Sequence, residues 1–168
     1  MIAPDDRRAI ARQLGRDPRD VIAVAHRCPC GQPDVVTTSP RLSDGTPFPT
    51  VYYLTCPRAS SAVGRLEGTG VMRDMEAQLE SDRELRDAYA EAHDAYLAAR
   101  AALGEVPEID GVSAGGMPDR VKCLHVLLAH ALAAGPGVNP LGDEARELVG
   151  DWWIGHSCAQ GPESGDAP

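Results

Sequence analysis

The cysteines are the residues of this 168-residue sequence that could take part in the widest range of chemistry. Their number is odd, and the N-terminal stretch MIAPDDRRAIARQLG lacks the apolar run of a signal peptide. We therefore expect reduced thiols in a cytoplasmic protein, acting as metal ligands, nucleophiles or small buried side chains. The five are Cys28, Cys30, Cys56, Cys123 and Cys158.

A structural zinc site is the first chemistry that these positions suggest, since it needs four Cys or His ligands in a tetrahedron. Cys28 and Cys56 each stand at the end of a predicted strand, where two strand ends can lie side by side. Cys123 and His125 lie near the start of a predicted helix. If that helix points toward the strand ends, these four residues form a Cys₃His site for zinc. An iron–sulfur cluster would use the same thiolates.

Spacing weakens this hypothesis and leaves alternatives open. Two residues apart on a helix, Cys123 and His125 point about 200° away from each other, so both bind one ion only where the backbone is not yet helical. Packed free thiols are the competing interpretation. A Cys/His-dependent enzyme would pair Cys123 with His125 or His130, but His130 is better explained as a hydrogen-bonded core residue. We assign no catalytic residue.

A second candidate site for a ligand is the glycine-rich loop that precedes the same helix. Gly116 is followed by two cations, Arg120 and Lys122. A loop of this kind leading into a helix N-terminus can bind phosphate or carboxylate. Because cations at a helix start oppose the helix dipole, Arg120 and Lys122 require a partner. Salt bridges to the many carboxylates of the chain are the competing explanation.

Composition limits the classes of function. Sixteen basic residues against 25 acidic ones give a net charge of −9, which argues against bulk nucleic-acid binding. No stretch approaches the roughly 18 apolar residues that span a bilayer. The length suits a single domain, which we expect over residues 1–156, followed by a disordered tail over 157–168.

The elements that position these residues suggest an α+β fold. Short runs rich in β-branched and aromatic residues predict three strands in an antiparallel meander. Apolar periodicity predicts about five helices packed against this small sheet. The strands are expected at 21–26, 34–38 and 50–56, and the later helices at 58–67, 71–79, 82–103, 120–134 and 141–153, after a first helix that ends before Gly15.

The helix over 82–103 is the longest of them. Ser81 and Glu84 have the spacing of a capping box, and an apolar stripe that includes Tyr89 and Tyr96 runs along one face. We expect this stripe to stay partly exposed and to dock on a partner protein. Full burial of both tyrosines would exclude that mode.

Three strings in order resemble DUF501, a bacterial family common in actinobacteria: RCPCGQPDVV, DGTPFPTVYYLTCP and GMPDRVKCLHVLLAHALAAGPGVNPLGD. The family has no established activity. Its genes often neighbour one for a small cell-division coiled-coil protein, which the resemblance suggests as a partner. The strings include Cys28, Cys56, Cys123 and His125, whereas Cys30 departs from the family pattern and Cys158 lies outside it. We therefore expect a non-enzymatic protein with a metal site and a protein partner.

Overall fold

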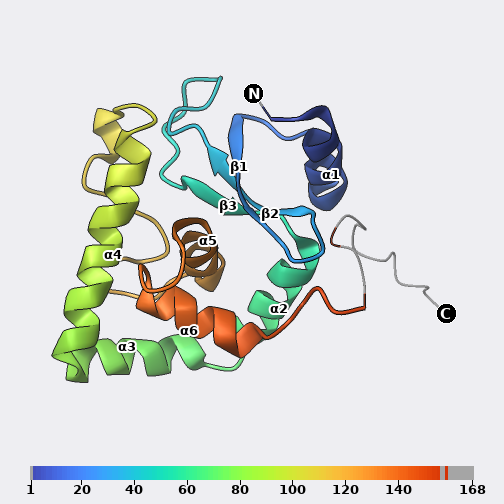
Figure 1. The fold of residues 1–168 in the computed structure, drawn as a ribbon. Helices are drawn as coiled ribbons and strands as arrows, with labels where there is room; N and C mark the ends of the chain where they lie inside the picture. The colour runs from blue at the N-terminus through green and yellow to red at the C-terminus, as the bar shows by residue number, and fades with distance from the viewer. Residues whose placement is uncertain (1, 156–157, 159–168) are drawn as a thin grey trace.

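The chain folds as an α+β domain, as predicted, in a computed structural model that describes residues 2–155 and 158 (Figure 1). An antiparallel sheet of three strands lies beside six α-helices and one short 3₁₀ helix in this part of the chain. No described helix is long and apolar enough to span a membrane. The elements are α1 (Pro4–Leu14), β1 (Val21–Arg27), β2 (Pro33–Thr38), β3 (Tyr52–Leu54), α2 (Pro57–Glu67), α3 (Val71–Ser81), α4 (Arg83–Ala101), η1 (Pro107–Ile109), α5 (Leu124–Ala134) and α6 (Pro140–Val149).

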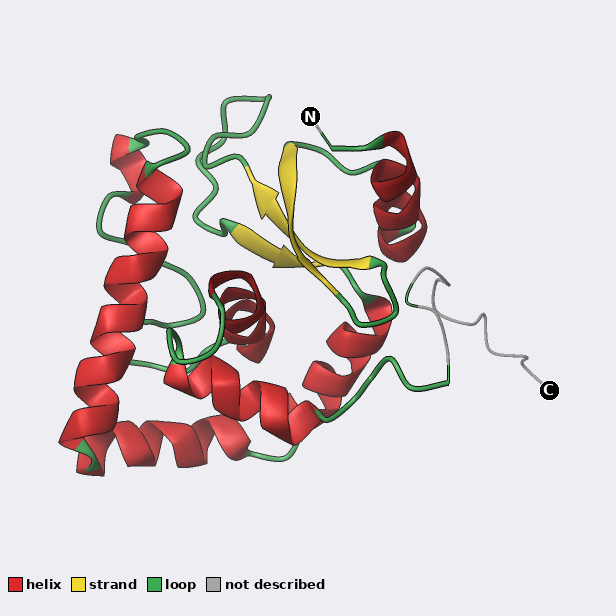
Figure 2. Ribbon diagram, in the orientation of Figure 1, coloured by secondary structure: helices red, strands yellow, loops and turns green. Residues whose placement is uncertain are grey.

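The sheet is the predicted meander, with β2 in the centre (Figure 2). Val36 of β2 pairs with Val24 of β1 on one side and with Tyr53 of β3 on the other. β3 is shorter than the expected 50–56. At its start the N–H of Val51 donates to the hydroxyl of Tyr96 instead of to β2, and at its end Cys56 already caps α2. β2 is almost entirely buried, which explains its run of apolar and β-branched residues.

Helix α5 lies at the centre of the molecule, between the sheet and the helices α2, α4 and α6 (Figure 1). Most of its side chains are buried, in agreement with a sequence that is apolar on nearly every face. The helix begins at Leu124, so the predicted start at residue 120 is wrong. The N–H of Arg120 donates to Gly116 O, and that of Lys122 donates to Gly115 O. These bonds hold the preceding segment in a tight turn instead of a helix.

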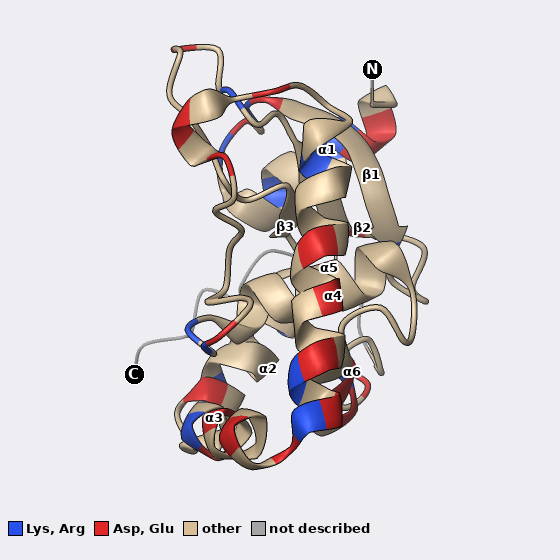
Figure 3. Cartoon of the chain, turned by 90° about the vertical axis from the view of Figure 1, so that its left-hand side faces the viewer, with Lys and Arg blue, Asp and Glu red and all other residues tan. Residues whose placement is uncertain are grey.

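Helix α4 forms part of the core, and the predicted docking mode is therefore wrong. Tyr89 and Tyr96 are fully buried, and the hydroxyl of Tyr89 donates to Arg120 O at 2.9 Å. The outward face of α4 carries charged side chains instead (Figure 3). The predicted capping residue is also corrected, because Ser81 ends α3 and the carboxylate of Asp82 accepts the N–H of Leu85.

Helix α6 ends at Val149, four residues before the predicted end, because Gly150 takes a positive φ of 67°. It crosses α5 at very close range. A Cβ on Gly142 would lie 2.3 Å from the carbonyl oxygen of Leu127, a distance that no real side chain tolerates. Only glycine fits here, and the two backbones approach each other through this position.

His130 is a buried core residue, as the sequence predicts. Its ring stacks on Tyr52 and meets Tyr96 edge-on. The Asn139 side chain connects it to α6, since Oδ1 accepts the N–H of Gly142 and Nδ2 donates to His130 Nδ1 at 3.1 Å. Burial lowers the pKa of His130 to about 4, so the ring is neutral at pH 7.

The close crossing of α5 and α6 gives a first prediction. We expect Gly142→Ala to lower the free energy of unfolding by about 2–3 kcal/mol, because the added methyl forces the helices apart. Urea denaturation measures the change. The matched control is Gly64→Ala in α2, where a Cβ meets nothing within 4 Å. That control should gain about 0.5–1 kcal/mol from better helix propensity. If both substitutions changed the free energy of unfolding equally, the close approach of α5 and α6 at Gly142 would be contradicted.

A second prediction concerns pH. The folded pKa of His130 lies below the ordinary value of 6.5, so protonation favours the unfolded chain. The contribution of neutral His130 to the free energy of unfolding is complete above about pH 6.5. It is lost as the pH falls toward 4, by up to about 3 kcal/mol. We expect the difference in unfolding free energy between wild type and His130→Gln to shrink over this range. Urea titrations at several pH values measure it, and parallel curves would refute the assignment.

Candidate metal centre

Two cysteines occupy the turn that connects β1 to β2. Cys28 follows the last residue of β1, and its N–H donates to Gln32 O while its carbonyl accepts the N–H of Gly31. Gly31 closes the turn with a φ of 85°. Because the backbone here is not regular, Cys28 and Cys30 can present their sulfurs to the same side although they are only two residues apart.

Cys56 approaches this turn from the start of α2. It is the N-cap residue, and its sulfur accepts the N–H of Ala59 at 3.5 Å. Pro57 occupies the first helical position, where its missing N–H costs nothing. The cap therefore fixes the Cys56 thiol at the positive end of the helix dipole, an environment that favours a thiolate.

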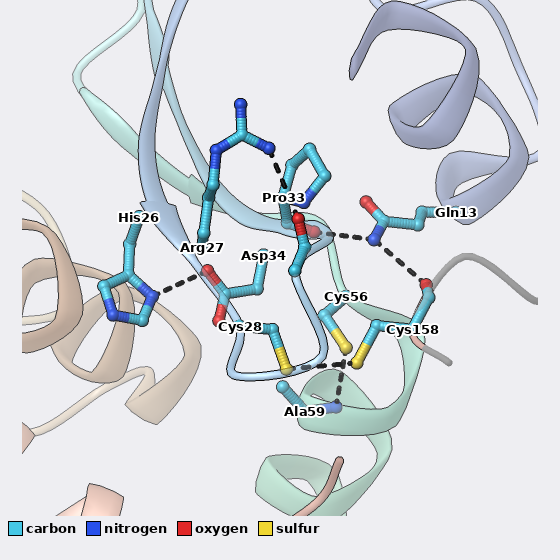
Figure 4. A network of polar contacts seen from close by, with 10 residues as sticks. Gln13, His26, Arg27, Cys28, Pro33, Asp34, Cys56, Ala59 and Cys158 are labelled. Atoms are coloured by element: carbon cyan, nitrogen blue, oxygen red, sulfur yellow. Dashed lines mark hydrogen bonds and ion pairs between the residues drawn. The ribbon is translucent and has the colours of Figure 1, made fainter. Parts of the chain in front are cut away.

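Cys158 reaches the same place from the C-terminal end of the chain. It is fully buried, and its Sγ lies 3.4 Å from the Sγ of Cys28. Gln13 of α1 holds this position, because its side-chain amide donates both to Cys158 O at 3.0 Å and to Pro33 O at 2.7 Å. Figure 4 shows the sulfurs of Cys28, Cys56 and Cys158 facing one another.

The four thiols form one cluster, here called the thiol cluster: Cys28, Cys30, Cys56 and Cys158. The sulfurs of Cys28, Cys30 and Cys158 all lie within 4.8 Å of one another, close enough to bind one metal ion. Cys56 does not belong to that group of three, but its sulfur lies beside that of Cys158 in Figure 4. All four are free thiols.

The pKa values within the thiol cluster diverge. A hydrogen bond from Cys158 lowers the pKa of Cys56 to about 7, and the amides of Ala59 and Arg58 assist. The same bond raises the pKa of Cys158, while burial raises that of Cys28 to about 11. The pKa of Cys30 is lowered as well, so the thiols of Cys56 and Cys30 are the ones whose ionisation the surroundings favour.

Unpartnered polar atoms surround the thiol cluster. Four buried side-chain N or O atoms lack a hydrogen-bond partner in the part of the chain that the structure describes, and three of them belong to Gln13, Asp34 and Thr55. Asp34 is fully buried, with Oδ1 accepting from His26 Nδ1 at 2.8 Å and Oδ2 unpaired. A buried oxygen without a partner is uncommon in folded proteins, so Asp34 Oδ2 marks a place in this region where a polar ligand would be stabilised.

A second group of ligand atoms lies at the start of α5, here called the α5 triad: Glu67, Cys123 and His125. One ligand atom from each lies within 4.8 Å of the other two. Glu67, the last residue of α2, accepts the N–H of Leu124 at 2.7 Å and faces His125 Nδ1 at 3.2 Å. His125 Nε2 lies 3.2 Å from Ser60 O. All three side chains are half-buried.

Charge is shared within the α5 triad. The hydrogen bond with Cys123 raises the pKa of His125 to about 9, despite burial, and Glu67 adds to the effect. Burial opposes ionisation of Cys123, yet His125 and the N–H of Val126 lower the pKa of its thiol overall. The triad thus combines an electron-rich sulfur, an imidazole and a carboxylate at one place.

The predicted ligands divide between these two groups. Cys28 and Cys56 belong to the thiol cluster, whereas Cys123 and His125 belong to the α5 triad, so the structure does not bring the four together. The predicted conflict between Cys123 and His125 is resolved because Cys123 is the N-cap of α5, with extended φ and ψ of −155° and 108°. Its side chain leaves the backbone before the helix begins.

The predicted anion-binding loop already faces carboxylates of the chain itself. Gly116 is required by its turn, since a Cβ there would lie 2.6 Å from Arg120 O. The N–H of Val121 donates to Glu76 Oε1 at 3.1 Å, as that of Leu124 does to Glu67. The side chains of Arg120 and Lys122 are exposed. Internal glutamates thus accept the amides that an external anion would use.

Sequence reasoning missed three residues of these groups and the neighbouring Asp34. Cys30 was treated as optional and Cys158 as part of a tail; of the predicted tail, only Cys158 lies within the described residues. A Cys-x-Cys spacing and a single thiol in the last segment were the available signals. Glu67 and Asp34 carry no local signal, because only the tertiary packing of α2 and β2 brings them to the sites.

Two cavities of the described part of the chain lie away from both groups of ligand atoms. One of about 430 Å³ is lined by the end of α4 and the segment 104–110, and another of about 300 Å³ by the segment 14–21, the loop 42–48 and parts of the sheet. Neither includes a residue of the thiol cluster or the α5 triad. These two cavities are therefore not substrate pockets for the thiols.

Comparison with known proteins places the chain in a family. No curated protein and no solved structure gives a significant match. The family described as "Protein of unknown function (DUF501)" matches residues 24–147. This range includes the α5 triad and three residues of the thiol cluster, but Cys158 lies beyond it. Because the match covers most of the sequence, the chain belongs to the DUF501 family.

Proposed function

We propose that this protein binds one structural zinc ion through the thiol cluster. The proposal rests on one observation, the convergence of the sulfurs of Cys28, Cys30 and Cys158 within 4.8 Å from two distant parts of the chain. Cys56, whose sulfur faces Cys158 in Figure 4, would supply the fourth ligand. Thiolates bound to one zinc lie roughly 3.8 Å apart, since Zn–S bonds are about 2.3 Å and meet at tetrahedral angles. The Cys28–Cys158 separation of 3.4 Å needs only a small adjustment.

The role of this ion is structural and non-enzymatic. Four thiolates close the coordination sphere, which leaves no position for water or substrate. The ion would join the β1–β2 turn, the start of α2 and the segment that follows α6. Gln13 already connects the start of β2 with the C-terminal segment, because it bonds both Pro33 and Cys158. Zinc–sulfur bonds would hold the same two segments together much more strongly. The ion would thereby hold the C-terminal segment against the sheet.

Metal analysis of the full chain, purified without oxygen, tests the proposal. We expect wild type to hold zinc and the double variant Cys28→Ser/Cys158→Ser to hold one equivalent less. Cobalt substitution should give wild type the intense charge-transfer absorption of a tetrathiolate site. The matched control is Cys123→Ser, which removes a thiol outside the cluster and should keep this absorption. Equal zinc content in wild type and the double variant would refute the proposal.

Removal of the metal should also loosen the C-terminal segment. We expect a strong chelator to speed proteolytic cleavage between Val149 and Cys158 in wild type, because without the metal Cys158 keeps only its contacts with the Cys28 thiol and the Gln13 amide. Limited proteolysis with mass spectrometry measures the rate. In Cys28→Ser/Cys158→Ser the cleavage should be fast from the start and insensitive to chelator. A chelator effect of the same size in both proteins would show that the ion does not hold the C-terminal segment in place.

A further inference from the structure

His125 meets hydrogen-bond acceptors at both ring nitrogens. Nε2 lies 3.2 Å from the carbonyl oxygen of Ser60, and Nδ1 lies 3.2 Å from Glu67 Oε1. A neutral imidazole has only one N–H, so one of its nitrogens would place a lone pair against an oxygen lone pair. A second positive centre must therefore lie on the ring, either a second proton or a metal ion.

The surroundings of Nδ1 have the composition of a metal site. Three potential ligand atoms converge here, from Glu67, Cys123 and His125, all within 4.8 Å of one another. No Lys or Arg forms an ion pair with Glu67 within the described residues. A nitrogen and an oxygen bound to one zinc at about 2.1 Å each lie roughly 3.4 Å apart, close to the 3.2 Å found.

The Ser60 carbonyl supplies the outer contact that such a histidine needs. Metal-bound histidines donate their other ring N–H to a carbonyl or carboxylate, which fixes the tautomer and the ring orientation. With Nε2–H on Ser60 O, the lone pair of Nδ1 points toward Glu67. Glu67 is fixed in turn by the N–H of Leu124 at 2.7 Å. Ligand and supporting contacts are both in place.

We propose that Glu67, Cys123 and His125 form a second, open binding site for a divalent transition metal of zinc type. Three protein ligands leave the fourth position to water, and the half-buried side chains put this position within reach of solvent. The mixed sulfur, nitrogen and oxygen donors select zinc or cobalt and reject magnesium, which requires oxygen ligands. This site is independent of the thiol cluster.

Cobalt titration of the Cys28→Ser/Cys158→Ser variant tests this site, because the thiol cluster is disabled there. We expect one equivalent to bind, with charge-transfer absorption of a single thiolate, and magnesium in excess not to compete. Cys123→Ser in this background should abolish the absorption, and His125→Gln should weaken binding by at least about 100-fold. The control His93→Gln removes a histidine outside both sites and should change nothing. Absorption that survives Cys123→Ser would overturn the proposal.

Two further readouts keep the test decisive if the double variant does not fold. On the wild-type chain, His125→Gln should lose one equivalent of zinc while the tetrathiolate cobalt absorption stays. Ring ¹⁵N NMR of wild type with zinc should show one N–H on His125, at Nε2. Two N–H groups at neutral pH with zinc in excess would mean that the second positive centre is a proton, and the metal site would be refuted.

Discussion

The fold depends on the burial of α5 from all sides. A helix whose sequence is apolar on nearly every face has to be enclosed, and here the sheet covers it on one side while α2 and α6 pack on it. Helix α4 reaches it through Tyr96, whose ring meets His130 edge-on. The requirement extends to polar groups, because His130 is buried with it and finds its partner on Asn139. It extends to backbones as well, since Gly142 lets α6 lie directly on Leu127.

The same helix sets the position of the α5 triad. Its first turn needs acceptors for exposed N–H groups, and Glu67 meets this need at Leu124. The carboxylate that caps the helix is therefore the one that faces His125. In the thiol cluster, Cys56 likewise caps α2 with its sulfur. Each group uses a helix N-terminus to fix an electron-rich side chain where the amides stabilise negative charge.

The sequence predicts what is local and periodic. The three strands, the burial of His130 and the stripe on α4 follow from alternation and helical spacing, which report the face that a residue occupies. They do not report what covers that face. The stripe on α4 was therefore predicted to be a docking surface, whereas it packs in the core. The start of α5 was missed because Gly115 and Gly116 accept bonds that propensity cannot foresee. The thiol cluster joins positions 28 and 158, and pairing over such a separation leaves no periodic signal.

A link between Cys28 and Cys158 spans 130 residues. With a metal ion bound there, nearly the whole chain would form one closed loop, and its effect would fall mainly on the unfolded ensemble. Ring closure of this length removes chain entropy worth roughly 5 kcal/mol in the simplest polymer treatment. Since β2, β3 and the helices from α2 to α6 all lie between these two residues, a single coordination site at the junction of the loop would stabilise elements that it never touches.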